Sequence, residues 1–231
     1  MPIISARSRR LVPAPVRALA GFQMLALPAL ALRLAALALP LAALMPANPA
    51  FAQFSESYKF LDSVRKKEGD KVNEALQVPG TQIVNTRDVS TGESALHIVT
   101  ARRDLLWMQF LVGKGANVNI HNNKGETPLV IAANLGFLEG VDFLISVGAR
   151  VDEPNNTGET PLISAVHVRN MALVRSLLKA GANPDHPDNS GRSARDYAAL
   201  DKNTAMSEEL DAAAAKKKQQ DKGGQTYGPT F

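Results

Sequence analysis

The sequence has no cysteine, and this absence excludes several structural and chemical possibilities. The chain cannot form disulfides, use a thiol nucleophile or build a cysteine metal site. It also cannot carry the lipid anchor of bacterial lipoproteins, which needs a cysteine at the cleavage site. A P-loop glycine pattern, an HExxH motif and a Ser-His-Asp order are missing too. We therefore expect stability to come from packing alone, and we expect no enzymatic activity and no cofactor.

The first part of the chain lacks acidic residues. Residues 1–52 contain no Asp or Glu but carry Arg7, Arg9, Arg10, Arg17 and Arg33. The uncharged apolar run LAALALPLAALM follows at 34–45, and the small-x-small site Ala50-Phe51-Ala52 comes after it. This order is typical of a secretory signal peptide. We predict a signal peptide over 1–52, cleavage between Ala52 and Gln53, and a periplasmic protein; translation starts at Met1 or Met24.

Two alternatives explain the same segment less well. An uncleaved membrane anchor needs about 20 apolar residues, whereas Arg33 and Pro40 interrupt this run. The stretch SRRLV at 8–12 has the paired arginines of a twin-arginine export signal but lacks the rest of that pattern. Cleavage also removes five arginines, which reduces the 26 Lys+Arg to 21 against 22 Asp+Glu and gives a net charge of −1. The mature chain therefore offers no basic excess for nucleic acid, and we expect it to contain no membrane span.

A unit of 33 residues repeats along the rest of the chain. The word GETPL occurs at 125–129 and again at 158–162, and GESAL and GRSAR are looser copies. The glycines that open these words are Gly92, Gly125, Gly158 and Gly191, so units start at 92, 125, 158 and 191. Structural units recur at a fixed period, whereas catalytic motifs do not.

Each unit predicts two short helices with a break between them. A hydroxyl residue caps the first helix, and in two units a proline follows the cap, where its missing N–H has no effect. A glycine ends the second helix. These positions are Ser94, Thr127, Thr160 and Ser193 for the caps, Pro128 and Pro161 for the prolines, and Gly115, Gly148 and Gly181 for the ends. One such pair cannot bury its apolar face alone, but stacked pairs can.

These features resemble the ankyrin repeat, which has a 33-residue period and the motif T-P-L-H-x-A. The resemblance covers roughly residues 92–210 and implies an all-α solenoid of stacked helix-turn-helix units with short β-turn fingers. The stretches PGTQIVNTRDVSTGESALH and ARDYA are similar to exported single-domain ankyrin-repeat proteins of Gram-negative bacteria. That similarity implies a periplasmic module for binding another protein.

The ends of the repeat array depart from the pattern. We expect a capping helix pair and a slightly long first finger over 53–91, repeats over 92–212 and a disordered tail over 213–231. Arg195 stands where earlier units have Leu129 and Leu162, which is tolerable only if no further repeat covers it. The lysines at 216–218 are expected to be a solvated helix end; contact with an anionic surface is the alternative.

Two aromatic residues have predicted structural roles. The resemblance places His97 at the histidine of the motif, where its ring should bond Ser94 or a neighbouring turn. Trp107 aligns with Gly140 of the next unit, so we expect it to pack over that glycine, with a surface hot spot as the alternative. The four histidines come from different units, so we predict no metal site.

The variable positions of the repeats are the candidates for partner binding on a concave surface. Leu135 and Val168 would form an apolar strip at the ends of two first helices, edged by Arg102, with Asn134 and His167 beside it. Finger residues His121, Asn123 and Lys124 would contribute a polar rim, and Glu93, Glu126 and Glu159 an acidic ladder. The alternatives are that the apolar pair only completes helix packing and that the glutamates stabilise helix N-termini.

The function predicted from these features is non-enzymatic binding of one protein partner by a monomer. Two narrower functions stay open at this point. One is an immunity-type inhibitor of an exported toxin or enzyme, and the other is an envelope stress or scaffold protein.

Overall fold

The computed structural model describes residues 49–223. Residues 1–48, which hold most of the expected signal peptide, and residues 224–231 lie outside the described part. The described part contains ten α-helices and one 3₁₀ turn. They are α1 Pro49–Arg65, α2 Gly69–Gln77, η1 Ile83–Asn85, α3 Ala95–Ala101, α4 Leu105–Gly113, α5 Pro128–Asn134, α6 Leu138–Ser146, α7 Pro161–His167, α8 Met171–Lys179, α9 Ala194–Leu200 and α10 Thr204–Gly223.

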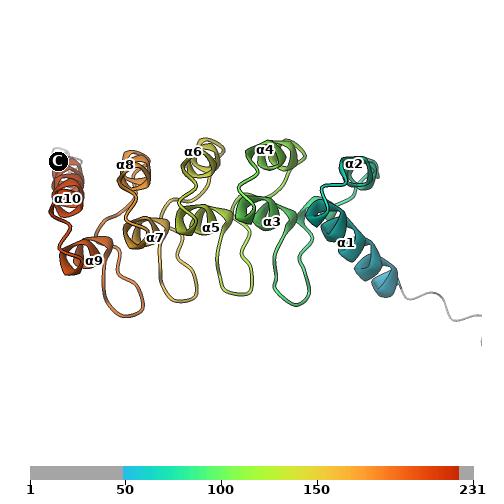
Figure 1. Ribbon diagram of the computed structural model, residues 1–231, viewed down its shortest axis with the longest axis horizontal. Helices are drawn as coiled ribbons and strands as arrows, with labels where there is room; N and C mark the ends of the chain where they lie inside the picture. Colours follow the sequence, from blue (N-terminus) through green and yellow to red (C-terminus); the bar gives the residue numbers. More distant parts are fainter. Residues whose placement is uncertain (1–48, 224–231) are drawn as a thin grey trace, which may run out of the picture. The chain divides into compact units, whose positions relative to one another are not determined.

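The helices form two rows (Figure 1). The first-helix row consists of α1, α3, α5, α7 and α9, and each of these helices packs against the next one in the row. The second-helix row consists of α2, α4, α6, α8 and α10, and in it α4, α6, α8 and α10 pack in succession. We call the loops over 78–94, 114–127, 147–160 and 180–193 the fingers; all four extend on the side of the first-helix row (Figure 1).

The predicted caps and breaks set the helix boundaries. The hydroxyl oxygens of Thr127 and Thr160 accept the backbone N–H groups of Val130 and Ile163, each at 3.3 Å. Between the two helices of each pair, one residue adopts a left-handed conformation, which reverses the chain. These residues are Lys67, Arg103, Gly136, Arg169 and Lys202. Four of the five breaks are therefore built without glycine.

The core lies between the two rows and repeats with the units. Leu96, Leu129 and Leu162 occupy the same place in three first helices and are almost completely buried. Arg195 takes this place in α9, where its guanidinium is partly exposed and pairs with Asp185 and Asp211, each at 3.1 Å. The structure thus accommodates the charge at the end of the stack by ion pairs with the finger before it and with α10.

Both ends of the described part differ from the expected boundaries. The sequence predicted a disordered tail from residue 213, but α10 continues as helix to Gly223. The run of alanines and lysines after Asp211 has good helix formers throughout, and this composition explains the longer helix. At the other end, α1 begins at Pro49, ahead of the expected cleavage point. Among residues 49–223, no helix has the length and apolar content needed to cross a membrane.

Candidate interaction surface

His97 is fully buried and links two consecutive units. Its Nδ1 accepts the backbone N–H of Ser94 at 3.0 Å, and its Nε2 lies 3.0 Å from the carbonyl oxygen of Glu126. Because an amide can only donate, Nδ1 is unprotonated and Nε2–H donates to Glu126. The pKa of His97 is lowered to about 4, chiefly by burial, and the positive charge of Arg87 contributes in the same direction. The prediction that His97 bonds Ser94 and a neighbouring turn is confirmed, since the Ser94 hydroxyl also lies 2.9 Å from Nδ1.

A ladder of asparagines joins each finger to the finger before it. The backbone N–H groups of Asn123, Asn156 and Asn189 donate to carbonyl oxygens of the preceding finger at 2.9, 3.0 and 3.0 Å. Their side-chain amides donate to a second carbonyl of that finger at 2.9, 3.0 and 2.9 Å. The fingers are therefore held at a fixed spacing. Asn123, which the sequence assigned to partner binding, uses its amide group inside this ladder.

The acidic ladder of Glu93, Glu126 and Glu159 is half-buried rather than fully presented to solvent. Each carboxylate accepts a hydrogen bond from a residue close to it in the chain, donated by Thr91 at 3.2 Å, Asn122 at 2.8 Å and Ser164 at 2.9 Å respectively. These bonds fix the side chains just before the first helices, where negative charge is favourable. An acidic edge for a basic partner stays a prediction.

The last residue of each first helix is exposed. Ala101, Asn134, His167 and Leu200 recur every 33 residues at the ends of α3, α5, α7 and α9. The same repeat position therefore carries a small, a polar, an aromatic and an apolar side chain in four successive units. Because these helix ends and the fingers lie on the same side of the stack, we call this surface the finger face.

Leu135 and Val168, which were predicted to form an apolar strip edged by Arg102, differ in exposure, and their role in partner binding stays a prediction. Leu135 is partly buried and packs against the core, so it completes the end of α5. Arg102 donates to the carbonyl oxygen of Val64 at 2.7 Å and to Asp104 at 3.1 Å, which ties it to the preceding helix pair. Only Val168 is exposed, at 39%. The flexible arginine side chain reaches backward across the stack, and this reach explains why three residues in register have different surroundings.

Repeat four supplies finger-face residues that sequence reasoning missed. The Tyr197 ring lies edge-on against His167, with 4.6 Å between the ring centroids, and its hydroxyl donates to Asp188 at 2.5 Å. Nδ1 of His167 lies 3.3 Å from the Glu159 carboxylate. Hydrogen bonds from Tyr197 and Ser190 lower the pKa of Asp188 well below its usual range. The missed signal was the ARDYA stretch, which was used only as part of the resemblance to exported ankyrin-repeat proteins.

Exposed apolar side chains surround this network. Leu200 is 62% exposed and Val168 is 39% exposed, while the Arg192 guanidinium lies 6.0 Å from the centre of the Tyr197 ring. The result is an aromatic and apolar patch at repeats three and four with charged groups at its edge. This composition is common at the centres of protein interfaces.

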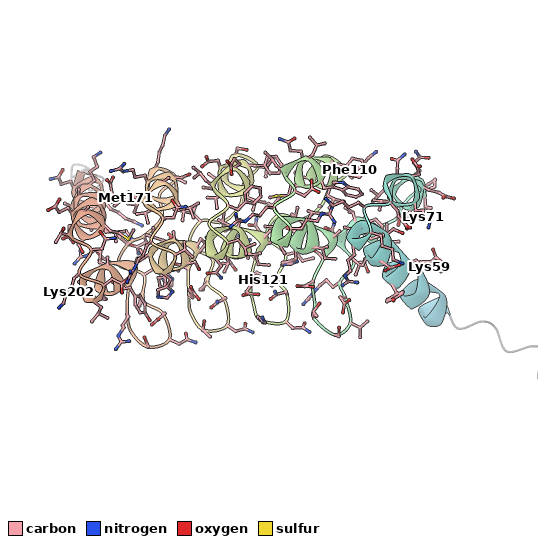
Figure 2. All side chains as sticks on the ribbon, viewed as in Figure 1. Lys59, Lys71, Phe110, His121, Met171 and Lys202 are labelled. Atoms are coloured by element: carbon pink, nitrogen blue, oxygen red, sulfur yellow. The ribbon has the colours of Figure 1, made fainter. Side chains whose placement is uncertain are left out.

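Two other predicted residues lie on the finger over 114–127, which precedes repeat two. Nε2 of His121 is 3.2 Å from the Glu153 carboxylate of the following finger, and Lys124 is exposed. Figure 2 shows His121 on the side of the fingers and Phe110 in the opposite row. His121, Lys124, Asn134 and His167 therefore share the finger face, and their contact with a partner stays a prediction. Among residues 49–223, no three His, Asp or Glu side chains are placed to hold a metal ion.

The predicted contact of Trp107 with Gly140 is wrong. The space beside the Gly140 α-carbon is filled by the Phe137 ring at the start of the same helix. Trp107 instead lies against Phe110, with 5.8 Å between the ring centroids, and under the Arg102 guanidinium at 5.3 Å. It lines a groove of about 300 Å³ between α2 and α4 together with Leu106, which is 77% exposed. The alternative of a surface position is therefore closer to the structure.

Comparison with protein families matches more than half of the chain. A model of ankyrin repeats in three copies matches residues 63–155, and a single ankyrin-repeat model matches residues 157–189. The chain belongs to the ankyrin-repeat family, and its fold is an all-α solenoid of helix-turn-helix repeats. The match begins within α1, so the N-terminal helix pair takes part in it. Ankyrin repeats are generally non-enzymatic modules, and the chain is a protein–protein interaction module.

Proposed function

We propose that this chain is an exported periplasmic protein that binds one protein partner through the finger face of repeats three and four, without enzymatic activity. The observation that carries the site is the patch formed by His167, Val168, Tyr197 and Leu200. Its apolar members Val168 and Leu200 are exposed, whereas the His167 ring and the Tyr197 hydroxyl are held by hydrogen bonds to Glu159 and Asp188. A rigid patch loses little conformational freedom on binding, which favours affinity.

Site-specific photocrosslinking tests the position of the site. A photoreactive amino acid replaces Leu200 in one variant and Leu106 in a control, because Leu106 is also exposed, at 77%, but lies in α4 of the second-helix row. We expect a discrete crosslinked partner at position 200 and none at position 106. A partner that crosslinks equally at both positions, or only at position 106, would refute the finger-face site.

The same experiment separates the two narrower functions. A single crosslinked partner that forms a one-to-one complex with the chain supports an immunity-type inhibitor of an exported toxin or enzyme. Many envelope proteins crosslinked at low yield support a stress or scaffold protein.

Export is tested independently of the partner. The basic, acid-free segment 1–52 and its Ala50-Phe51-Ala52 site motivate the proposal. The intact mass and N-terminal sequence of protein from the periplasmic fraction should correspond to a chain that begins at Gln53. Recovery of a membrane-bound chain that keeps residues 34–45 would contradict cleavage and periplasmic release.

A further inference from the structure

A second hollow lies in the second-helix row, on the side of the stack away from the fingers. It is a groove of about 490 Å³ between α8 and α10. Its floor consists of small residues, which leave space between the two helices: Gly181, Ala182, Ala212 and Ala213. None of the patch residues His167, Val168, Tyr197 and Leu200 lines this groove, so it forms a separate surface.

The charges that line the groove are unbalanced. Arg175 and Lys179 come from α8, and Lys216 and Lys217 come from α10, whereas Glu209 is the one carboxylate among the described lining residues. The Arg175 guanidinium donates to Glu209 at 2.9 Å, so these two charges largely neutralise each other. Three lysines therefore give the groove a net positive charge.

Helix stability explains why the lysines lie toward the C-terminal ends of their helices, but not why lysines of two helices line the same groove. Lys179 lies in the last turn of α8, and Lys216 and Lys217 lie in the C-terminal half of α10. A cation near a helix C-terminus is stabilising by a few tenths of a kcal/mol at an exposed position. That stabilisation is the same whichever face of the helix the lysine occupies. Here the lysines of two different helices line the same hollow, which concentrates positive potential where a ligand can enter.

We propose that the α8–α10 groove binds an acidic segment of a protein, in which clustered Asp or Glu carboxylates pair with Lys179, Lys216 and Lys217. An ammonium group is a point charge on a flexible stem and can meet carboxylates in many geometries. The alanine and glycine floor lets an extended backbone approach closely. A hollow between two helices fits an extended chain better than the flat array of headgroups on an anionic membrane, which would contact only the outermost lysines.

Fluorescence anisotropy of a labelled octaglutamate peptide tests the proposal with the full chain. The groove variant carries Lys179→Gln, Lys216→Gln and Lys217→Gln. The control carries Lys59→Gln, Lys66→Gln and Lys71→Gln, which removes the same charge from exposed lysines of α1 and α2. We expect the groove variant to bind the peptide about tenfold more weakly, because three partly exposed ion pairs are lost and each contributes modestly. The control should stay within about twofold of the unmodified chain. Circular dichroism verifies that both variants are folded.

A steric pair of variants separates a groove from a general attraction of charge. Ala212→Met fills the groove and keeps every charge, whereas Ala215→Met makes the same change at an exposed site of α10 that does not line it. Weaker peptide binding in Ala212→Met alone supports the groove. Equal binding by both methionine variants, equal loss in both lysine variants, or no peptide binding by the unmodified chain would overturn the proposal.

The last experiment measures binding of the chain to vesicles of phosphatidylglycerol and phosphatidylcholine in equal parts. Vesicle binding that depends on the three groove lysines, without peptide binding, would assign the groove to a membrane surface and overturn the protein segment. Peptide binding with no lysine-dependent vesicle binding supports it. The crosslinks at position 200 are measured in a separate experiment, so the finger-face site and the α8–α10 groove can be refuted independently.

Discussion

Repeats two and three differ from repeat four at positions where the next unit would stack. A Cβ placed on Gly158 would lie 2.5 Å from the backbone nitrogen of Asn189 in the following finger, whereas a Cβ on Gly191 would meet nothing within 4 Å. Leu162 is fully buried, whereas Arg195 at the same place is partly exposed and ion-paired. The repeated glycine and leucine are therefore constrained by the neighbouring unit, whereas the repeated threonine caps the unit's own helix.

The largest expected effect is at the buried leucine. Leu162→Ala should lower the free energy of unfolding by about 3 to 4 kcal/mol, because it leaves a cavity between two stacked units. Arg195→Ala, at the same repeat position, removes two surface ion pairs and should lower it by less than about 1 kcal/mol. Urea denaturation followed by circular dichroism measures both values. Equal losses in the two variants would show that the end of the stack is packed like its middle.

The opening glycines should show the next largest difference. Gly158→Ala places a methyl group against the next finger and also strains a left-handed residue, so we expect a loss of about 3 kcal/mol. Gly191→Ala has only the backbone strain, because its φ is +79° and its surroundings are open, and should lose about 1 kcal/mol. Thermal and urea unfolding report both. A Gly191→Ala variant as unstable as Gly158→Ala would contradict the open end.

The sequence predicted the features that lie within one unit or follow the period. Caps at Thr127 and Thr160, the helix pairs and the bond from His97 to Ser94 depend on residues a few positions apart, and spacing alone indicates them. The Trp107 prediction failed because the position of a residue in the repeat does not determine which way a long side chain points. For the same reason the hydrogen bond from Arg102 to Val64 could not be predicted. Trp107 turns toward the preceding helix pair, where α2 and α4 leave a groove.

The candidate site was predicted in outline for the same reason. His121, Lys124, Asn134 and His167 lie on the finger face because their place in the repeat determines their side of the stack. The role of Asn123 in the ladder depends on hydrogen bonds to backbone groups of the preceding finger, and the identity of a residue does not predict such bonds. Tyr197 was missed because the fourth unit was treated as an incomplete end rather than as part of the surface.

His97 and Asp196 occupy the same repeat position and should respond to different pH ranges. The folded pKa of His97 is lowered to about 4 from 6.5, so stability is complete above pH 6.5 and is lost as the pH falls toward 4. We expect a loss of about 2 kcal/mol over this range. The pKa of Asp196 is lowered by its hydrogen bonds to Ser193, so its contribution is lost only below the usual aspartate pKa, about 3.9.

Unfolding by urea at several pH values measures the two windows. His97→Gln keeps an acceptor at the capping position and should flatten the curve between pH 6.5 and 4. Asp196→Asn should leave that part of the curve unchanged. If His97→Gln keeps the full slope, the buried ring is not the group that titrates there.

The smallest expected effect tests the direction of the comparison. The side-chain amides of Asn156 and Asn189 both donate to the finger before them, at 3.0 and 2.9 Å. The bond of Asn189 therefore exists although no described finger follows it. Asn156→Ala and Asn189→Ala should each lower the free energy of unfolding by about 1 kcal/mol, the net value of one hydrogen bond. Urea denaturation resolves this loss when Asn203→Ala, outside the ladder, serves as the cap control, since its side chain accepts the N–H of Met206 instead. A neutral Asn189→Ala beside a destabilising Asn156→Ala would mean that the last finger is not held by the ladder. Equal losses would mean that the last finger is held by its hydrogen bonds to the preceding finger as firmly as a finger in the middle of the stack.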